Sequence, residues 1–279
     1  MKIGYVQFRP RFGEKERNLE RALRFLENGA RQDADLMVLP ELFNTGYVFR
    51  SRDEVKALSE RIPEGETTRA LIRFAEDNNL YIVAGICESE GNKFFNSAIL
   101  VSPDEDVSVY RKAHLFYEEK IWFSQGNIPF SVYDIEKARV GIMICYDWFF
   151  PEVIRVLSLK GAQIICHPSN LMLPYCQKAM LGAAVQNRVF IVTANRVGTE
   201  RGVRFTGKSQ IVAPDMRILA SSRRRGEEVK VVDVNPADAD SKRITRYNDL
   251  WADRRLELYK PLLDRFPPFK DLNEWDDNL

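Results

Sequence analysis

The sequence predicts an α/β fold, and three features of its apolar pattern support that prediction. Short apolar segments of strand length recur along most of the chain. Segments with apolar residues at helical spacing separate several of them. Strand-like and helix-like segments therefore alternate, which is the pattern typical of α/β proteins.

The predicted strands begin almost at the N-terminus and follow one another at intervals up to residue 194. Several of them are apolar throughout, as is typical of strands that are covered on at least one full face. The predicted strands of this part of the chain span residues 2–8, 36–39, 81–86, 97–101, 140–144, 162–166 and 190–194.

Helices are predicted between these strands wherever apolar residues recur at helical spacing. Residues 19–26 and residues 71–75 each show this spacing. Residues 153–159 form a third apolar helical stretch, and Pro151 suits the first turn of that helix because a proline there loses no hydrogen bond.

The C-terminal third of the predicted fold is antiparallel. Residues 209–212, 218–221 and 228–234 have the pattern of strands with turns between them, so mixed sheets are expected. The run Arg223-Arg224-Arg225 lies between the last two strands and is predicted to be a charged hairpin tip.

No linker or repeat is visible, so we expect one domain over residues 1–260. Residues 261–279, with Phe266, Phe269 and Trp275, are expected to form an irregular C-terminal arm.

Composition excludes some classes of partner. The 279 residues are 45% hydrophobic and 29% charged, as in ordinary soluble globular proteins. Lys and Arg total 41 against 40 Asp and Glu, so nothing favours a nucleic acid as partner. No signal peptide or membrane-length apolar segment is visible, and four cysteines are too few for a disulfide framework in a chain of this size. We therefore expect a cytoplasmic protein that does not bind membranes.

A cysteine at a sharp turn is the first candidate functional residue. The apolar strand over residues 140–144 ends at Cys145, shortly before the helix predicted at Pro151. A thiolate at such a turn is stabilised by backbone N–H groups and by a helix N-terminus. A lone cysteine after an apolar strand is nevertheless more often a buried core residue.

Two other strand ends carry charged residues that suit the same chemistry. Glu41 follows the strand over residues 36–39, behind a proline that cannot continue the sheet, and Lys112 follows a further strand at residues 107–110. Each residue alone is more typical of a surface. If the three strand ends meet at one edge, however, a thiol, a carboxylate and an ammonium converge, and this set can perform acyl transfer.

Each residue type meets a chemical need of that reaction. Glu41 is the candidate general base for the Cys145 thiol, and it is also the candidate that protonates the leaving nitrogen and later activates water. Lys112 supplies positive charge where the oxygen of the tetrahedral intermediate becomes negative, with the Tyr146 N–H as a further donor.

The segments around these residues resemble the signature segments of the nitrilase superfamily of carbon–nitrogen hydrolases. They are Pro40-Glu41, Tyr110-Arg111-Lys112-Ala113-His114-Leu115, and Gly141 to Asp147 followed by Phe150-Pro151-Glu152, in the family's order. The resemblance extends from Met1 to about Tyr259. It implies a four-layer α-β-β-α sandwich with a Glu–Lys–Cys triad at one end.

The resemblance also implies a fourth site residue and an assembly. Family members have a second glutamate in the loop after the lysine, which positions the lysine and the substrate. Glu119 is the choice by its spacing from Lys112, with Glu118 as the alternative. Family resemblance further implies a homodimer or a higher homo-oligomer. Neither a cofactor nor a metal is required by the chemistry.

Other kinds of site fit the sequence less well. A Cys/His protease-like site would use His114 or His167, the only two histidines. A zinc site would use Cys87, Cys166, His167 and Cys176, but the usual ligand spacings are absent from the sequence. A non-enzymatic relative of the family would be marked by loss of a triad residue, and none is lost.

The substrate is expected to be a small amide or nitrile. In the family, Tyr-Asp after the cysteine is common in amidases, so Tyr146-Asp147 favours an amide substrate. The following aromatic run from Trp148 is also found in some nitrilases, so a nitrile or an N-carbamoyl compound remains an alternative. The candidate substrate-binding residues are Tyr47, Trp122, Tyr146, Trp148 and Asn170.

Overall fold

Two six-stranded mixed sheets form the centre of the protein in a computed structural model that describes residues 1–264. One sheet has the order β14-β1-β2-β3-β4-β5 and the other the order β13-β12-β9-β8-β7-β6. The strands of the first are Glu228–Asp233, Lys2–Gln7, Leu36–Val38, Tyr81–Glu90, Lys93–Val101 and Val107–Arg111. Those of the second are Ile218–Ser221, Gln210–Val212, Phe190–Asn195, Ile164–Ser169, Arg139–Ile142 and Val132–Asp134.

Each sheet is built around three neighbouring parallel strands that helices connect. In the first sheet β1, β2 and β3 are parallel, with α1 (Lys15–Ala30) and α3 (Glu66–Asn78) between them in the chain. In the second, β7, β8 and β9 are parallel, and α5 (Pro151–Leu159) and α6 (Cys176–Asn187) connect them. Antiparallel strands complete both sheets. Parallel neighbours need such crossover connections, which is why helices and strands alternate along the sequence.

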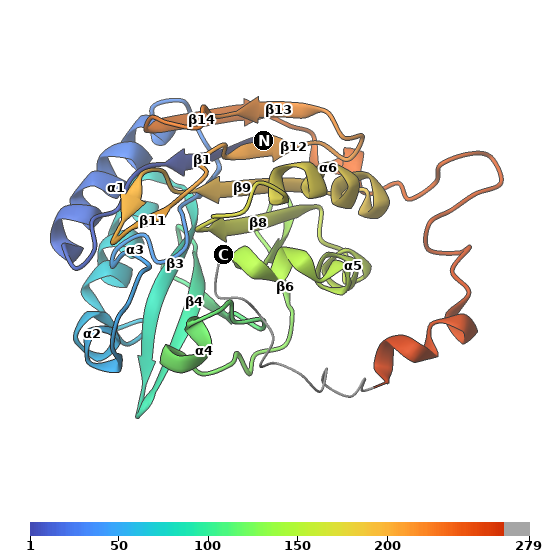
Figure 1. Cartoon of the computed structure of the whole chain (residues 1–279). Helices are drawn as coiled ribbons and strands as arrows, with labels where there is room; N and C mark the ends of the chain where they lie inside the picture. The colour runs from blue at the N-terminus through green and yellow to red at the C-terminus, as the bar shows by residue number, and fades with distance from the viewer. Residues whose placement is uncertain (265–279) are drawn as a thin grey trace. The chain divides into compact units, whose positions relative to one another are not determined.

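The helices cover the outer faces of two sheets that pack on each other (Figure 1). Leu26 of α1 and Leu71 of α3 lie in one apolar cluster with Met37 and Ile82 of the first sheet. A second cluster joins inward-facing residues of both sheets with the apolar faces of α5 and α6. The result is the expected four-layer α-β-β-α sandwich.

The sequence prediction missed several short elements. They are α2 (Arg52–Leu58), α4 (Glu119–Trp122), β6, the two-residue strands β10 (Thr199–Glu200) and β11 (Val203–Arg204), and the 3₁₀ turns Cys145–Phe149 and Pro236–Ala239. Most of these segments are too short to show an apolar period. Helix α6 was missed although it is longer, because its apolar residues are spread around the helix and are not confined to the buried face.

The predicted hairpin at Arg223-Arg224-Arg225 is wrong. Strand β13 pairs with β12 in the second sheet, whereas β14 pairs antiparallel with β1 in the first. The arginine run therefore lies where the chain passes from one sheet to the other. The Gln7 side chain holds this crossover by donating to the carbonyl oxygens of Arg223 (2.9 Å) and Gly226 (3.0 Å). Local pattern indicates that a segment is a strand, but its partner is fixed by packing of distant residues.

The chain divides into two compact units, Met1–Lys242 and a second unit that begins at Arg243. The second unit contains 3₁₀ turns at Leu256–Leu258 and Lys260–Leu263. Most of the predicted arm over residues 261–279, with its three aromatic residues, lies outside the described residues, and the domain boundary at residue 260 stays a prediction. Within residues 1–264, no helix has both the length and the hydrophobicity required to cross a membrane.

Candidate active site

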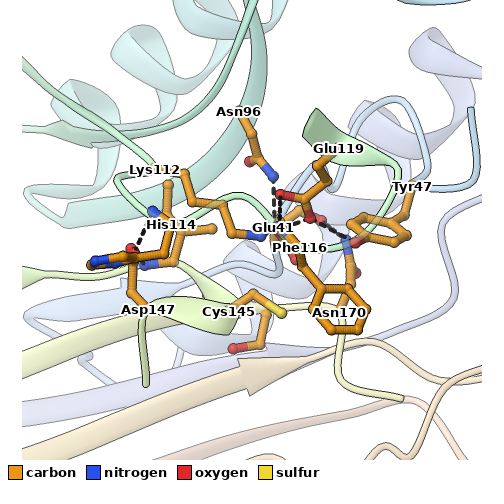
Figure 2. Close-up of polar contacts among 12 residues, drawn as sticks. Glu41, Tyr47, Asn96, Lys112, His114, Phe116, Glu119, Cys145, Asp147 and Asn170 are labelled. Atoms are coloured by element: carbon orange, nitrogen blue, oxygen red, sulfur yellow. Dashed lines mark hydrogen bonds and ion pairs between the residues drawn. The ribbon is translucent and has the colours of Figure 1, made fainter. Parts of the chain in front are cut away.

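Glu41, Lys112 and Cys145 lie together at one edge of the sandwich (Figure 2). Glu41 follows β2, Lys112 follows β5, and Cys145 lies just beyond β7. The carboxyl ends of the central strands of both sheets therefore open to the same edge, which is where α/β sheets usually place their sites. The structure brings the three side chains together although long stretches of sequence separate them.

Glu41 is completely buried, and its two oxygens have different surroundings. Oε1 accepts hydrogen bonds from Lys112 Nζ and from Asn96 Nδ2, each at 2.7 Å. Oε2 has no hydrogen-bond partner among the described residues. A Cβ at position 85 would lie 2.4 Å from the Glu41 Cα, so only glycine lets β3 pass this close to the turn. One oxygen of Glu41 is thus held, and the other is available for proton transfer.

Lys112 is fixed between two carboxylates. Its Nζ donates to Glu41 Oε1 and to Glu119 Oε1, both at 2.7 Å. Burial alone would lower the pKa of Lys112, but Glu119 and Glu41 outweigh burial and raise it above its usual range. The side chain is therefore a permanent positive charge that is pointed at the Glu41 carboxylate.

Glu119, and not Glu118, lies on this cluster. Its Oε1 also accepts a hydrogen bond from the Tyr47 hydroxyl at 2.6 Å, and its Oε2 accepts one from the Phe116 N–H at 3.2 Å. Burial raises the pKa of Glu119, although Lys112 and these hydrogen bonds oppose the effect. Glu118 is exposed. The choice between the two glutamates from spacing therefore agrees with the geometry.

Cys145 begins the 3₁₀ turn in a left-handed backbone conformation, with φ +40°. Its side chain is nearly buried, at 7% exposure. Burial and the neighbouring Glu41 raise the pKa of the Cys145 thiol well above its usual range, whereas Lys112 and the Asn170 backbone N–H act to lower it. The resting sulfur is consequently a neutral thiol.

The sequence model of the carbon-nitrogen hydrolase family matches residues 2–244. This chain belongs to that family. The matched range includes Glu41, Lys112, Glu119 and Cys145, and it ends close to the boundary between the two compact units.

Relatives of this hydrolase include both nitrilases and amidases. A nitrilase of Pyrococcus abyssi is 46% identical over 259 residues, which cover 93% of this chain and 99% of the relative. An (R)-stereoselective amidase of Pseudomonas sp. is 34% identical over 264 residues, covering 92% of this chain and 93% of the relative. An amidase from Nesterenkonia sp. has a crystal structure that matches with a TM-score of 0.79 and 27% identity, over 94% of this chain and 96% of that chain. Hydrolysis of a C–N bond is therefore the shared activity.

Asp147 joins the cysteine loop of the hydrolase to the lysine loop. Its Oδ2 accepts hydrogen bonds from the Tyr110 hydroxyl (2.8 Å) and the Ile144 N–H (2.9 Å). Its Oδ1 accepts from the His114 backbone N–H (3.0 Å) and contacts His114 Nδ1 (2.8 Å). One buried carboxylate thus fixes the spacing between the segments that carry Cys145 and Lys112.

The alternative sites predicted from histidines and cysteines receive no support from the geometry. His114 is bound to Asp147 and stacks on Phe150, with ring centroids 3.6 Å apart. The His167 ring bonds the backbone oxygen of Cys145 and the Thr193 hydroxyl. Within residues 1–264, no group of three or more His, Cys, Asp or Glu side chains is arranged to hold a metal ion.

The five candidate substrate-binding residues have different surroundings in the hydrolase. Tyr47 bonds Glu119, and Asn170 Nδ2 donates to the backbone oxygen of Glu41 at 2.9 Å. The Tyr146 ring packs against Phe116 and Phe150. Trp148 and Trp122 are packed against apolar clusters. Direct contact of any of these residues with a substrate stays a prediction.

Asn96 is a site residue that sequence reasoning missed. It lies in β4, its amide donates to Glu41, and its backbone oxygen accepts from the Lys112 N–H at 2.9 Å. The predicted strand began at residue 97, one residue too late to include it. A buried amide next to the apolar run of this strand was the feature that pattern analysis overlooked.

Proposed function

We propose that this protein hydrolyses the non-peptide C–N bond of a small amide through a thioester at Cys145, and that it releases ammonia and a carboxylic acid. The observation that carries the proposal is the buried ion cluster of Glu41, Lys112 and Glu119 beside a neutral thiol, with one Glu41 oxygen unpaired. A base, a fixed positive charge and a nucleophile are the groups that acyl transfer requires.

The first half of the reaction forms the thioester. Glu41 removes the thiol proton as the sulfur bonds to the amide carbon, and the amide oxygen becomes negative. Lys112 and the Tyr146 N–H stabilise this oxygen. When the intermediate collapses, the C–N bond breaks and Glu41 returns its proton to the leaving nitrogen, which departs as ammonia.

The second half consumes the thioester with water. Glu41 takes a proton from the water while the oxygen attacks the thioester carbon, and the C–S bond then breaks. The proton held by Glu41 returns to the sulfur, and the carboxylic acid leaves. Support for a reactive cysteine of this kind comes from a relative: the E41Q mutant of the Nesterenkonia amidase has been solved with the acetamide moiety of fluoroacetamide added covalently at its active-site cysteine.

A nitrile is the second candidate substrate, because the Pyrococcus abyssi relative at 46% identity is a nitrilase. Thiolate addition to a nitrile carbon gives a thioimidate whose nitrogen takes up a proton. Water then adds, ammonia leaves, and the same thioester results. The proposed residues serve both routes, so the substrate must be identified by experiment.

Ammonia release from matched small amides, nitriles and N-carbamoyl compounds tests the proposal. We expect turnover of aliphatic amides, and hydroxylamine should divert the thioester to a hydroxamic acid that is detectable by mass. Turnover of nitriles alone would replace the primary proposal with the second candidate. Absence of turnover in all three classes would refute both candidates.

We further propose a cytoplasmic homodimer or higher homo-oligomer. Four free thiols, none in a disulfide, fit a reducing compartment. Phe149 and Leu159, at the two ends of the segment that contains α5, are 47% and 40% exposed and would be covered in an assembly.

The two adjacent glutamates provide a matched test of the cluster. Glu119→Gln should lower kcat by about 10- to 100-fold, because it removes one of the two negative charges that orient Lys112. Glu118→Gln alters only an exposed carboxylate and should leave kcat within about twofold. Steady-state ammonia assays on both variants measure the two kcat values. Equal losses of kcat in the two variants, or a larger loss at position 118, would contradict the assignment of Glu119 as the second glutamate.

A further inference from the structure

His167 is completely buried on β8, and its ring contacts the backbone of Cys145. Its Nε2 lies 3.0 Å from the Cys145 carbonyl oxygen, and its Nδ1 lies 3.1 Å from Thr193 Oγ1. The proposed mechanism gives this histidine no role. Its ring nevertheless binds the backbone of the proposed nucleophile itself.

The partners of the ring fix its protonation state. A carbonyl oxygen can only accept a hydrogen bond, so Nε2 must carry the proton and donate. The other nitrogen then accepts a hydrogen bond from the Thr193 hydroxyl, which is also completely buried. Burial lowers the pKa of His167 to about 4, so the ring is neutral at physiological pH. The Cys145 carbonyl thereby selects the tautomer, and the Thr193 hydroxyl satisfies the other ring nitrogen by donating to it.

The Cys145 carbonyl and the Tyr146 N–H belong to the same peptide group. A trans peptide is planar, so its C=O and its N–H point in opposite directions. Fixing the oxygen on the His167 side therefore fixes the N–H on the other side. Among residues 1–264, the Tyr146 N–H has no hydrogen-bond acceptor. The peptide lies next to a left-handed residue, where the backbone needs such support to persist.

We propose that His167 is a positioning residue that aims the unpaired Tyr146 N–H at the oxygen of the tetrahedral intermediate. Its hydrogen bond to the Cys145 carbonyl sets the orientation of the peptide, and the Thr193 hydroxyl holds the ring by donating to Nδ1. The Asp147 backbone N–H holds the preceding peptide by donating to the Ile144 carbonyl oxygen at 3.0 Å, so the cysteine backbone is held on both sides. This inference rests on the proposed function, since it assigns a role in that reaction.

Two reactions of the same sulfur separate positioning from simple structural support. Hydrolysis passes through an intermediate with a negative oxygen, or a negative nitrogen if the substrate is a nitrile. Alkylation by iodoacetamide forms an S–C bond at a saturated carbon and expels iodide, so no such negative atom develops. Misdirection of the Tyr146 N–H should therefore slow hydrolysis and leave alkylation unchanged.

His167→Leu removes the donor and supplies the first test. We expect kcat to fall by about 10- to 100-fold, as when an oxyanion donor is removed, with KM changed by less than about threefold. The rate of Cys145 alkylation should stay within about twofold. His167→Gln should restore most of kcat, because the Gln Nε2 can donate to the same carbonyl.

Thr193→Val and Thr193→Ser form a second, milder pair. The valine keeps the shape but removes the hydroxyl that holds the ring through Nδ1, and it should lower kcat by about three- to tenfold. The serine keeps the hydroxyl and should retain wild-type kcat. If His167→Leu does not fold, the two Thr193 variants test the positioning role of His167 in its place.

The assays use whichever substrate the wild-type protein hydrolyses, so the two proposals fail in different ways. If the wild type hydrolyses no substrate, the proposed function fails. If the wild type is active and His167→Leu or Thr193→Val keeps full kcat, the positioning role is refuted. Alkylation that falls in parallel with kcat would also refute it, because His167 would then only support the thiol or the fold.

Discussion

Replacing Cys145 by alanine should abolish ammonia release, with a loss of at least about 10⁴-fold in kcat. In the proposed reaction the sulfur forms the only covalent bond to the substrate, and the cluster of Glu41, Lys112 and Glu119 alone provides no substitute nucleophile. The variant should fold normally, since alanine only shortens a small side chain at the edge of the core. Ammonia assays at high enzyme concentration, combined with circular dichroism, measure both properties.

Cys87 offers the matched control for this substitution. It is a second buried free thiol, on β3, outside the ion cluster. Cys87→Ala should change kcat by less than about threefold, at a modest cost in stability. Residual activity of Cys145→Ala above about 1% of wild type would mean that another group attacks the substrate.

Replacing Lys112 by methionine should remove activity and stability together. The variant leaves the buried carboxylates of Glu41 and Glu119 facing each other without the cation that both contact. Loss of one partner from a buried ion pair typically costs about 3–5 kcal/mol, and loss of the charge that stabilises the intermediate should lower kcat by about 10³-fold or more. Urea denaturation and steady-state kinetics measure the two effects.

The stability loss in Lys112→Met should depend on pH. Without the ammonium, the pKa of Glu119 in the folded protein rises further above its unfolded value. A carboxyl group of this kind favours folding below its unfolded pKa, and that contribution is lost as pH rises through the folded pKa. The stability gap to wild type should therefore be smaller at pH 5 than at pH 8. Lys120→Met, which removes an exposed lysine of α4, should alter neither stability nor kcat appreciably.

The sequence predicted residues whose position follows from local pattern and chain order. Glu41, Lys112 and Cys145 each follow an apolar strand, and motifs in family order indicated that these strand ends meet. The roles of Asn96 and His167 could not be predicted in this way. The role of Asn96 depends on the register that places it opposite Cys87 in the neighbouring strand. The role of His167 depends on the packing of β8 beneath the cysteine turn.

In the fold, too, local pattern predicted the elements but not the long-range contacts between them. The strands at residues 218–221 and 228–233 were recognisable as strands, yet they belong to different sheets. Pairing partners are set by long-range packing, which leaves little trace in either strand. The four-layer arrangement was predicted only because the family resemblance supplied it.

The pairing of β1 with β14 affects how the protein is synthesised. Lys2 lies opposite Asp233, so β1 leaves the ribosome long before the neighbour with which it pairs. Until that neighbour emerges, one side of β1 is an open strand edge of the kind that promotes aggregation. Such distant pairing also slows folding, because a long loop must close before the contact can form. The nascent chain therefore depends on its C-terminal third to close the first sheet.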